Sequence, residues 1–113
     1  MSTTYIPKRP SRVAKTPWSY ADGGFDANVD GAQWLGRVHE YLELPIAKRR
    51  RGEPARVPWI ATAAQARAWA ERLTIAFKVF RIDAIDNVMH SDGPVYLRAW
   101  RDFLKTCGGY STR

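Results

Sequence analysis

The densest charge in this sequence is the run Lys48-Arg49-Arg50-Arg51, which lies in a segment too rich in proline to form one regular element. Four adjacent cations repel one another, so the run favours an anionic partner. Phosphate groups would suit it, because basic side chains that bind them release counterions and provide affinity without base preference. Carboxylates on an acidic protein surface would also suit it. A solvated loop that aids solubility is the structural alternative.

A second group of cations lies near the N-terminus. Residues 1–20 carry four cations and no acid, namely Lys8, Arg9, Arg12 and Lys15. Arg56 adds a further cation to the connector of residues 45–60. A tryptophan follows each group, Trp18 after the first and Trp59 after the second. Each indole could stack on an exposed base, which contributes about 1–3 kcal/mol, and burial in the core is the alternative for both.

We expect the two basic groups to act together. The connector ends on the expected cap of the central helix, and the N-terminus of a helix carries partial positive charge that favours anions. If Trp18 anchors the N-terminal segment nearby, both groups form one electropositive binding face. In the rival arrangement the N-terminal segment projects freely and the connector alone binds.

Residues that could perform catalysis are few and badly spaced. The sequence has one cysteine, Cys107, and two histidines, His39 and His90, and no pair of them has zinc-site spacing. His90 is followed by serine and aspartate, but adjacent residues cannot place nucleophile and base around one reacting atom. His39 and Glu43, one helical turn apart, are interpreted as a surface pair. We expect no catalytic residue, no metal and no cofactor.

Three amphipathic segments must position these residues. Residues 30–43, residues 62–82 or longer, and residues 94–107 carry apolar side chains at helical spacing. Each of these segments places one tryptophan on its apolar face. We assign these three tryptophans to the core: Trp34, Trp69 and Trp100.

Capping patterns mark the ends of the same segments. Thr62 and Gln65 have the spacing of a capping box, and Asp30 is expected to cap the first helix. Gly108 and Gly109 are expected to end the third helix, since glycine adopts the left-handed conformation that follows many helices. In the second helix, Ile75 is expected to lie on a widened, covered apolar face.

The predicted fold class is mainly α, with three helices in one small domain. Residues 1–29 contain three prolines and two glycines and are expected to form an extended, partly ordered arm in which we do not rely on a strand. Residues 30–113 are expected to form the helical domain, joined internally by the basic, proline-rich connector. A chain of 113 residues suits one modest core.

The sequence also bears on the cellular location of the protein. No stretch approaches the ~20 apolar residues that cross a bilayer, and the basic N-terminus is not followed by the apolar region of a secretory signal. We therefore expect no membrane partner. The single cysteine favours a reducing cytoplasm, and frequent Ala, Arg and Trp suit a bacterial or phage genome.

Together these patterns predict a small, basic, non-enzymatic protein that contacts nucleic acid or a nucleoprotein complex through the arm and the connector. The alternative is a protein-interaction module, such as an adaptor or a phage-type inhibitor of a host complex, that binds an acidic protein surface. Arg98, Arg101 and Lys105 offer a weaker groove-binding face, which Asp102 in the same stripe would oppose. Five tryptophans could also leave an apolar patch for a homodimer.

Overall fold

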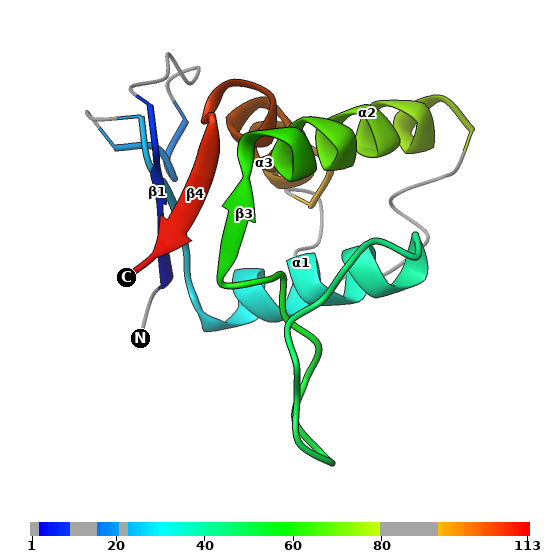
Figure 1. The fold of residues 1–113 in the computed structure, drawn as a ribbon. Coiled ribbons are helices and arrows are strands. Elements are labelled where there is room, and N and C mark those ends of the chain that lie inside the picture. Colours follow the sequence, from blue (N-terminus) through cyan, green and yellow to red (C-terminus); the bar gives the residue numbers. More distant parts are fainter. Residues whose placement is uncertain (1–2, 10–15, 21–22, 80–92) are drawn as a thin grey trace.

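Three helices and four short strands form two layers in the computed structural model, which describes residues 3–9, 16–20, 23–79 and 93–113 (Figure 1). The elements in chain order are β1 (Thr3–Pro7), β2 (Phe25–Ala27), α1 (Val29–Tyr41), β3 (Ile60–Thr62), α2 (Ala63–Val79), α3 (Gly93–Thr106) and β4 (Gly109–Thr112). The three helices confirm the amphipathic patterns. The mainly α class is wrong, because the four strands pair into a sheet and make the fold α+β.

The sheet is antiparallel throughout, with strand order β2-β1-β4-β3. Its buried face carries Tyr5, Phe25, Ala61 and Tyr110, while Ile60 and Ser111 point to the other side and are exposed. This alternation follows from the two-residue period of a strand. The helices therefore cover one face of the sheet only, as Figure 1 shows.

Chain separation explains why the sheet escaped prediction. β1 and β2 lie within the range expected to be an extended arm, and β4 begins at Gly109, the second glycine of the pair that follows α3. β1 pairs with β4, so the two ends of the chain meet in the middle of the sheet. Strands of three to five residues show little alternation on their own, and a pairing between chain ends leaves no local pattern.

The caps confirm two expectations and correct one. The Thr62 hydroxyl accepts from the Gln65 N–H at 3.2 Å and the Gln65 side-chain oxygen accepts from the Thr62 N–H at 2.9 Å, which completes the capping box. Gly108 and Gly109 end α3 with positive φ and lead into β4. Asn28, rather than Asp30, caps α1, because its side-chain oxygen accepts the N–H of the third helical residue at 2.7 Å.

Aromatic rings fill the space between the layers. Trp34, Trp69 and Trp100 are buried, as expected. Trp100 meets Tyr5 of β1 edge-on, with ring centroids 4.8 Å apart, an arrangement that aromatic quadrupoles favour. Ile75 is wrongly assigned to the covered face of α2, since half of its side chain is exposed.

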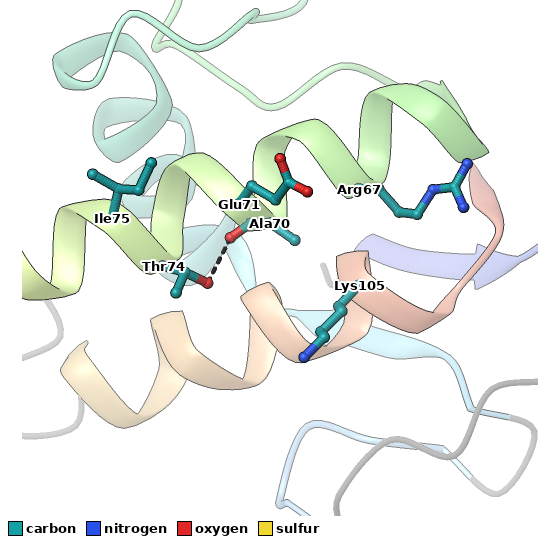
Figure 2. A pocket seen from close by; sticks show the side chains of 6 residues that line it. All are labelled: Arg67, Ala70, Glu71, Thr74, Ile75 and Lys105. Carbon is teal, nitrogen blue, oxygen red and sulfur yellow. Dashed lines mark hydrogen bonds between the residues drawn. The ribbon is translucent and has the colours of Figure 1, made fainter.

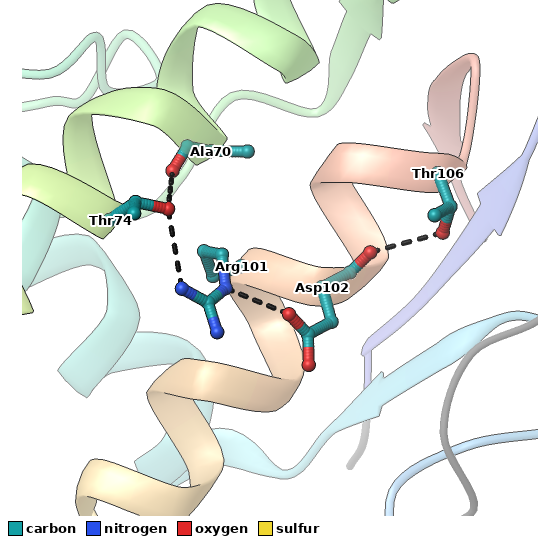
Figure 3. Close-up of polar contacts among 5 residues, drawn as sticks. All are labelled: Ala70, Thr74, Arg101, Asp102 and Thr106. Atoms are coloured by element: carbon teal, nitrogen blue, oxygen red, sulfur yellow. Dashed lines mark hydrogen bonds and ion pairs between the residues drawn. The ribbon is translucent and has the colours of Figure 1, made fainter.

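Arg101 of α3 links this helix to α2 (Figure 3). Its Nε donates to Asp102 at 2.7 Å and its Nη1 donates to the Thr74 hydroxyl of α2 at 3.2 Å. The guanidinium lies 5.2 Å from the Phe77 ring centroid, and Arg98 stacks on the same ring. Two of the three cations expected on a groove-binding face are thus engaged in helix packing.

Some expectations fall outside the described residues. The extension of the central helix beyond Val79 and its break before α3 lie in residues 80–92, and Arg12 and Lys15 also lie in a range that is not described. Within the described ranges, no helix combines the length and apolar character needed to cross a bilayer.

Candidate nucleic-acid interface

The connector between α1 and β3 folds back on itself as a projection, which we call the basic finger (residues 47–56). Its two arms are joined where the Ala47 N–H donates to the Arg56 carbonyl at 2.8 Å, and its tip closes where the Glu53 N–H donates to the Arg50 carbonyl at 3.1 Å. Gly52 supplies the positive φ that this turn requires. Figure 1 shows the finger extending away from the body of the protein.

The returning arm of the finger is seated on α1 at Gly36. A Cβ at this position would lie 2.0 Å from the Ala55 carbonyl oxygen, so only glycine permits the approach. Ala55 and Val57 are buried beside it. The glycine that lowers helix propensity by roughly 1 kcal/mol relative to alanine therefore holds the base of the finger.

The four cations of the run Lys48 to Arg51 are exposed, and Arg56, on the returning arm of the finger, is half-buried. Arg49 pairs with Glu40 of α1 at 2.9 Å, but both side chains are solvated, and such a pair contributes only about 0–1 kcal/mol. The side chains of Lys48, Arg50 and Arg51 form no ion pair with any residue that the structure describes. Three cations of the run thus remain free for an anionic partner.

Trp59 lies at the root of the finger and is 47% exposed. The Arg56 guanidinium carbon lies 5.8 Å from its ring centroid, a cation–π distance. A hollow of about 110 Å³ opens beside the ring and is lined by Ala47, Lys48, Arg49, Glu53, Pro54, Arg56 and Trp59. Four of the expected connector residues, Lys48, Arg49, Arg56 and Trp59, are therefore gathered around one hollow, whereas Arg50 and Arg51 do not line it.

The backbone that carries Trp59 is tied to β4. The Tyr110 hydroxyl donates to the Pro58 carbonyl, and the Thr112 hydroxyl donates to the carbonyl of Trp59 itself. Because Tyr110 is buried in the core, its bond ties the backbone next to Trp59 to the packed interior.

Lys8 and Arg9 lie elsewhere. Their N–H groups donate to Gly109 and Cys107 at 2.9 and 3.1 Å, where β1 leaves the sheet. That end of the sheet is level with Thr62, which pairs with Gly109, whereas the finger leaves from the opposite end, before Ile60 (Figure 1). The structure does not bring these two cations and the finger into one face.

Nor does the structure, within the residues it describes, place the connector at the N-terminus of α2, as was expected from the sequence. β3 separates Trp59 from Ala63, and three strand residues span about 10 Å.

Trp18, the other expected stacking residue, is half-buried and packs edge-on against Tyr96 with centroids 4.7 Å apart.

His39 is fully buried, so its interpretation as half of a surface pair with Glu43 is wrong. Its Nδ1 lies 3.1 Å from the Pro45 carbonyl oxygen, and the Trp100 indole N–H donates to its Nε2 at 3.2 Å. Burial lowers the pKa of His39 to about 4, so the ring is neutral. The structural role of His39 follows from its position in the core. The spacing of residues in the sequence does not reveal that position.

Cys107 is buried as well, and burial raises the pKa of its thiol, which disfavours the nucleophilic thiolate. Across the described ranges, no three His, Cys, Asp or Glu side chains are grouped to hold a metal ion.

A second concavity, of about 570 Å³, lies along α2 and α3 (Figure 2). Its lining is mixed: Arg67, Ala70, Glu71, Thr74, Ile75 and Lys105. The sequence does not reveal this concavity, because it depends on how the two helices pack. No local pattern in the sequence indicates it, since its lining residue Ile75 was expected on the covered face of α2 and is half-exposed.

Searches against protein-family models, curated proteins and solved structures find no match for this chain.

Proposed function

We propose that this protein is a non-enzymatic cytoplasmic binding protein that contacts nucleic acid, alone or in a nucleoprotein complex, through the basic finger. The observation that carries the proposal is the set of three exposed cations, Lys48, Arg50 and Arg51, without ion pairs to described residues on a braced projection. Like charges held close together raise the free energy of the isolated protein, and a polyanion removes that repulsion.

The shape of the finger supports the same partner. A backbone turn closes its tip and Gly36 seats its base, so the cations are presented at a distance from the body. Among described side chains that line the hollow, Glu53 is the only acid. The surface therefore has the cationic excess that backbone phosphates require.

The test removes the three unpaired charges from the finger by the variant Lys48→Ala/Arg50→Ala/Arg51→Ala. Its matched control, Arg67→Ala/Lys78→Ala/Lys105→Ala, removes three exposed cations from the helices. Binding of a fluorescent oligonucleotide is measured by anisotropy over a salt series. We expect the finger variant to lose most affinity, with a slope of log K against log salt that is shallower by roughly 0.7–0.9 for each lost phosphate contact.

The control variant should retain most of the affinity. Equal losses in both variants would show that net charge, and not the finger, drives association. Circular dichroism should report unchanged helix content in both, since every substituted side chain is exposed.

Substitution of Lys8 and Arg9 tests whether the N-terminal segment contributes to nucleic-acid affinity. Deleting residues 1–15 would remove β1, which pairs with both β2 and β4, so the double variant Lys8→Ala/Arg9→Ala is the appropriate change. Since these cations lie at the other end of the sheet, we expect a smaller loss of affinity than from the finger variant. A loss of affinity as large as that of the finger variant would support the expectation from the sequence that both basic groups form one binding face.

A protein partner is the second candidate function. The exposed Trp59 and Ile60 lie next to each other in the chain, beside the cations of the finger. An apolar pair with surrounding positive charge would fit an acidic protein surface with an apolar centre. Pull-down from a lysate, repeated after nuclease treatment, separates the candidates: a protein that is retained after nuclease and lost in the finger variant would favour this function.

A further inference from the structure

Trp59 is unlike the other four tryptophans of the chain, all of which lie in the described part. Trp34, Trp69 and Trp100 are buried and Trp18 is half-buried against Tyr96, whereas 47% of Trp59 is exposed. The core is complete without this ring, because the buried cluster does not include it. The exposed indole therefore needs an explanation other than packing.

The surroundings of the Trp59 ring suit the stacking of a nucleic-acid base. The Thr112 hydroxyl holds the Trp59 carbonyl and the Tyr110 hydroxyl holds the preceding Pro58 carbonyl, so the backbone that carries the ring has little freedom to lose on binding. The Arg56 guanidinium lies over the ring, and Lys48 lines the adjoining hollow. An aromatic ring beside two cations can receive a base on the ring and phosphates on the cations.

Such a site discriminates between forms of nucleic acid. In a duplex, each base face is covered by its neighbours, so a side chain in a groove reaches only base edges. In a single strand, unstacked bases expose their faces to aromatic side chains. Trp59 also lies at the root of the finger rather than at its tip, where a side chain would enter a groove.

We infer, on the basis of the proposed function, that the ligand is single-stranded nucleic acid with one base stacked on Trp59 and the adjacent phosphates bound by Arg56 and Lys48. The cations at the tip of the finger, Arg50 and Arg51, then contact the continuing backbone of the same strand.

The experiment compares one labelled oligonucleotide of about 12 nucleotides, single-stranded or annealed to its complement, in low-salt buffer. We expect the protein to bind the single strand roughly tenfold or more tightly than the duplex, as one added stacking contact would provide. Trp59→Ala should weaken single-strand binding by about 5- to 100-fold. Trp59→Phe should retain most of the affinity, because it keeps an aromatic face.

Ile60→Ala is the matched control, since it removes a neighbouring exposed apolar side chain that has no aromatic face. It should leave binding unchanged. Tryptophan fluorescence gives a second measurement: the single strand should quench the wild-type emission, and Trp59→Phe should bind without that quenching.

The two proposals fail in different ways. Equal or tighter binding of duplex, with Trp59→Ala unchanged, would overturn the single-strand inference and leave the nucleic-acid proposal standing. Absence of binding to both forms would overturn the nucleic-acid proposal itself. Equal losses from Ile60→Ala and Trp59→Ala would show apolar contact rather than stacking and would also overturn the inference.

Discussion

The indole N–H of Trp100 donates to Nε2 of His39 at 3.2 Å inside the core. The other ring nitrogen, Nδ1, faces the Pro45 carbonyl oxygen at 3.1 Å, which can only accept. Both contacts are satisfied when the neutral ring carries its proton on Nδ1. One histidine thus joins α3 to the segment that leads into the basic finger.

Acid should destabilise the protein through His39. Its pKa in the folded state is about 4, lowered from 6.5 mainly by burial and partly offset by the bond to Pro45. The unfolded chain therefore binds more protons than the folded one between these values, so the stabilising effect is complete above the unfolded pKa and is lost as the pH falls from 6.5 through 4. Urea unfolding should show a loss of about 3 kcal/mol between about pH 7 and pH 4.

Two variants separate this effect from other titrations. His39→Gln removes the titrating ring, so it should be less stable near neutrality and should lose the pH dependence that His39 supplies. His90→Gln removes the other histidine of the sequence and should keep that dependence. A persistent acid loss in His39→Gln would assign the effect to other groups.

Gly36→Ala should destabilise the protein although alanine is the better helix former. The added Cβ would overlap the Ala55 carbonyl oxygen, with a separation of 2.0 Å, and backbone cannot yield as a flexible side chain does. We expect a loss of roughly 1–3 kcal/mol in thermal or urea unfolding, together with weaker nucleic-acid binding as the finger shifts. A gain in stability would contradict the seating of the finger on α1.

Leu73→Ala should lower the free energy of unfolding by about 2–5 kcal/mol, because the side chain is fully buried in α2 and its removal leaves a cavity. Ile75→Ala on the same helix is the control, and its half-exposed side chain should change stability by about 1 kcal/mol or less. Comparable losses at both positions would show that the buried face of α2 is wrongly assigned.

Local patterns in the sequence were sufficient to identify the helices. The capping box at Thr62 and Gln65, the glycines after α3 and the buried tryptophans were predicted because these signals act within a few residues of the chain. The basic run was likewise visible from composition, since charge is a property of the side chains wherever they lie.

Tertiary structure alone decided the sheet, the seat of the finger and the setting of His39. β1 and β4 pair across the length of the chain, Gly36 meets Ala55 through the return of the connector, and His39 meets Trp100 through the packing of two helices. Each contact joins residues far apart in sequence, and its free energy comes from desolvation and close packing that no single segment possesses. The amino-acid sequence by itself therefore determined the helices and the positive charge, whereas packing determined which cations gather around Trp59.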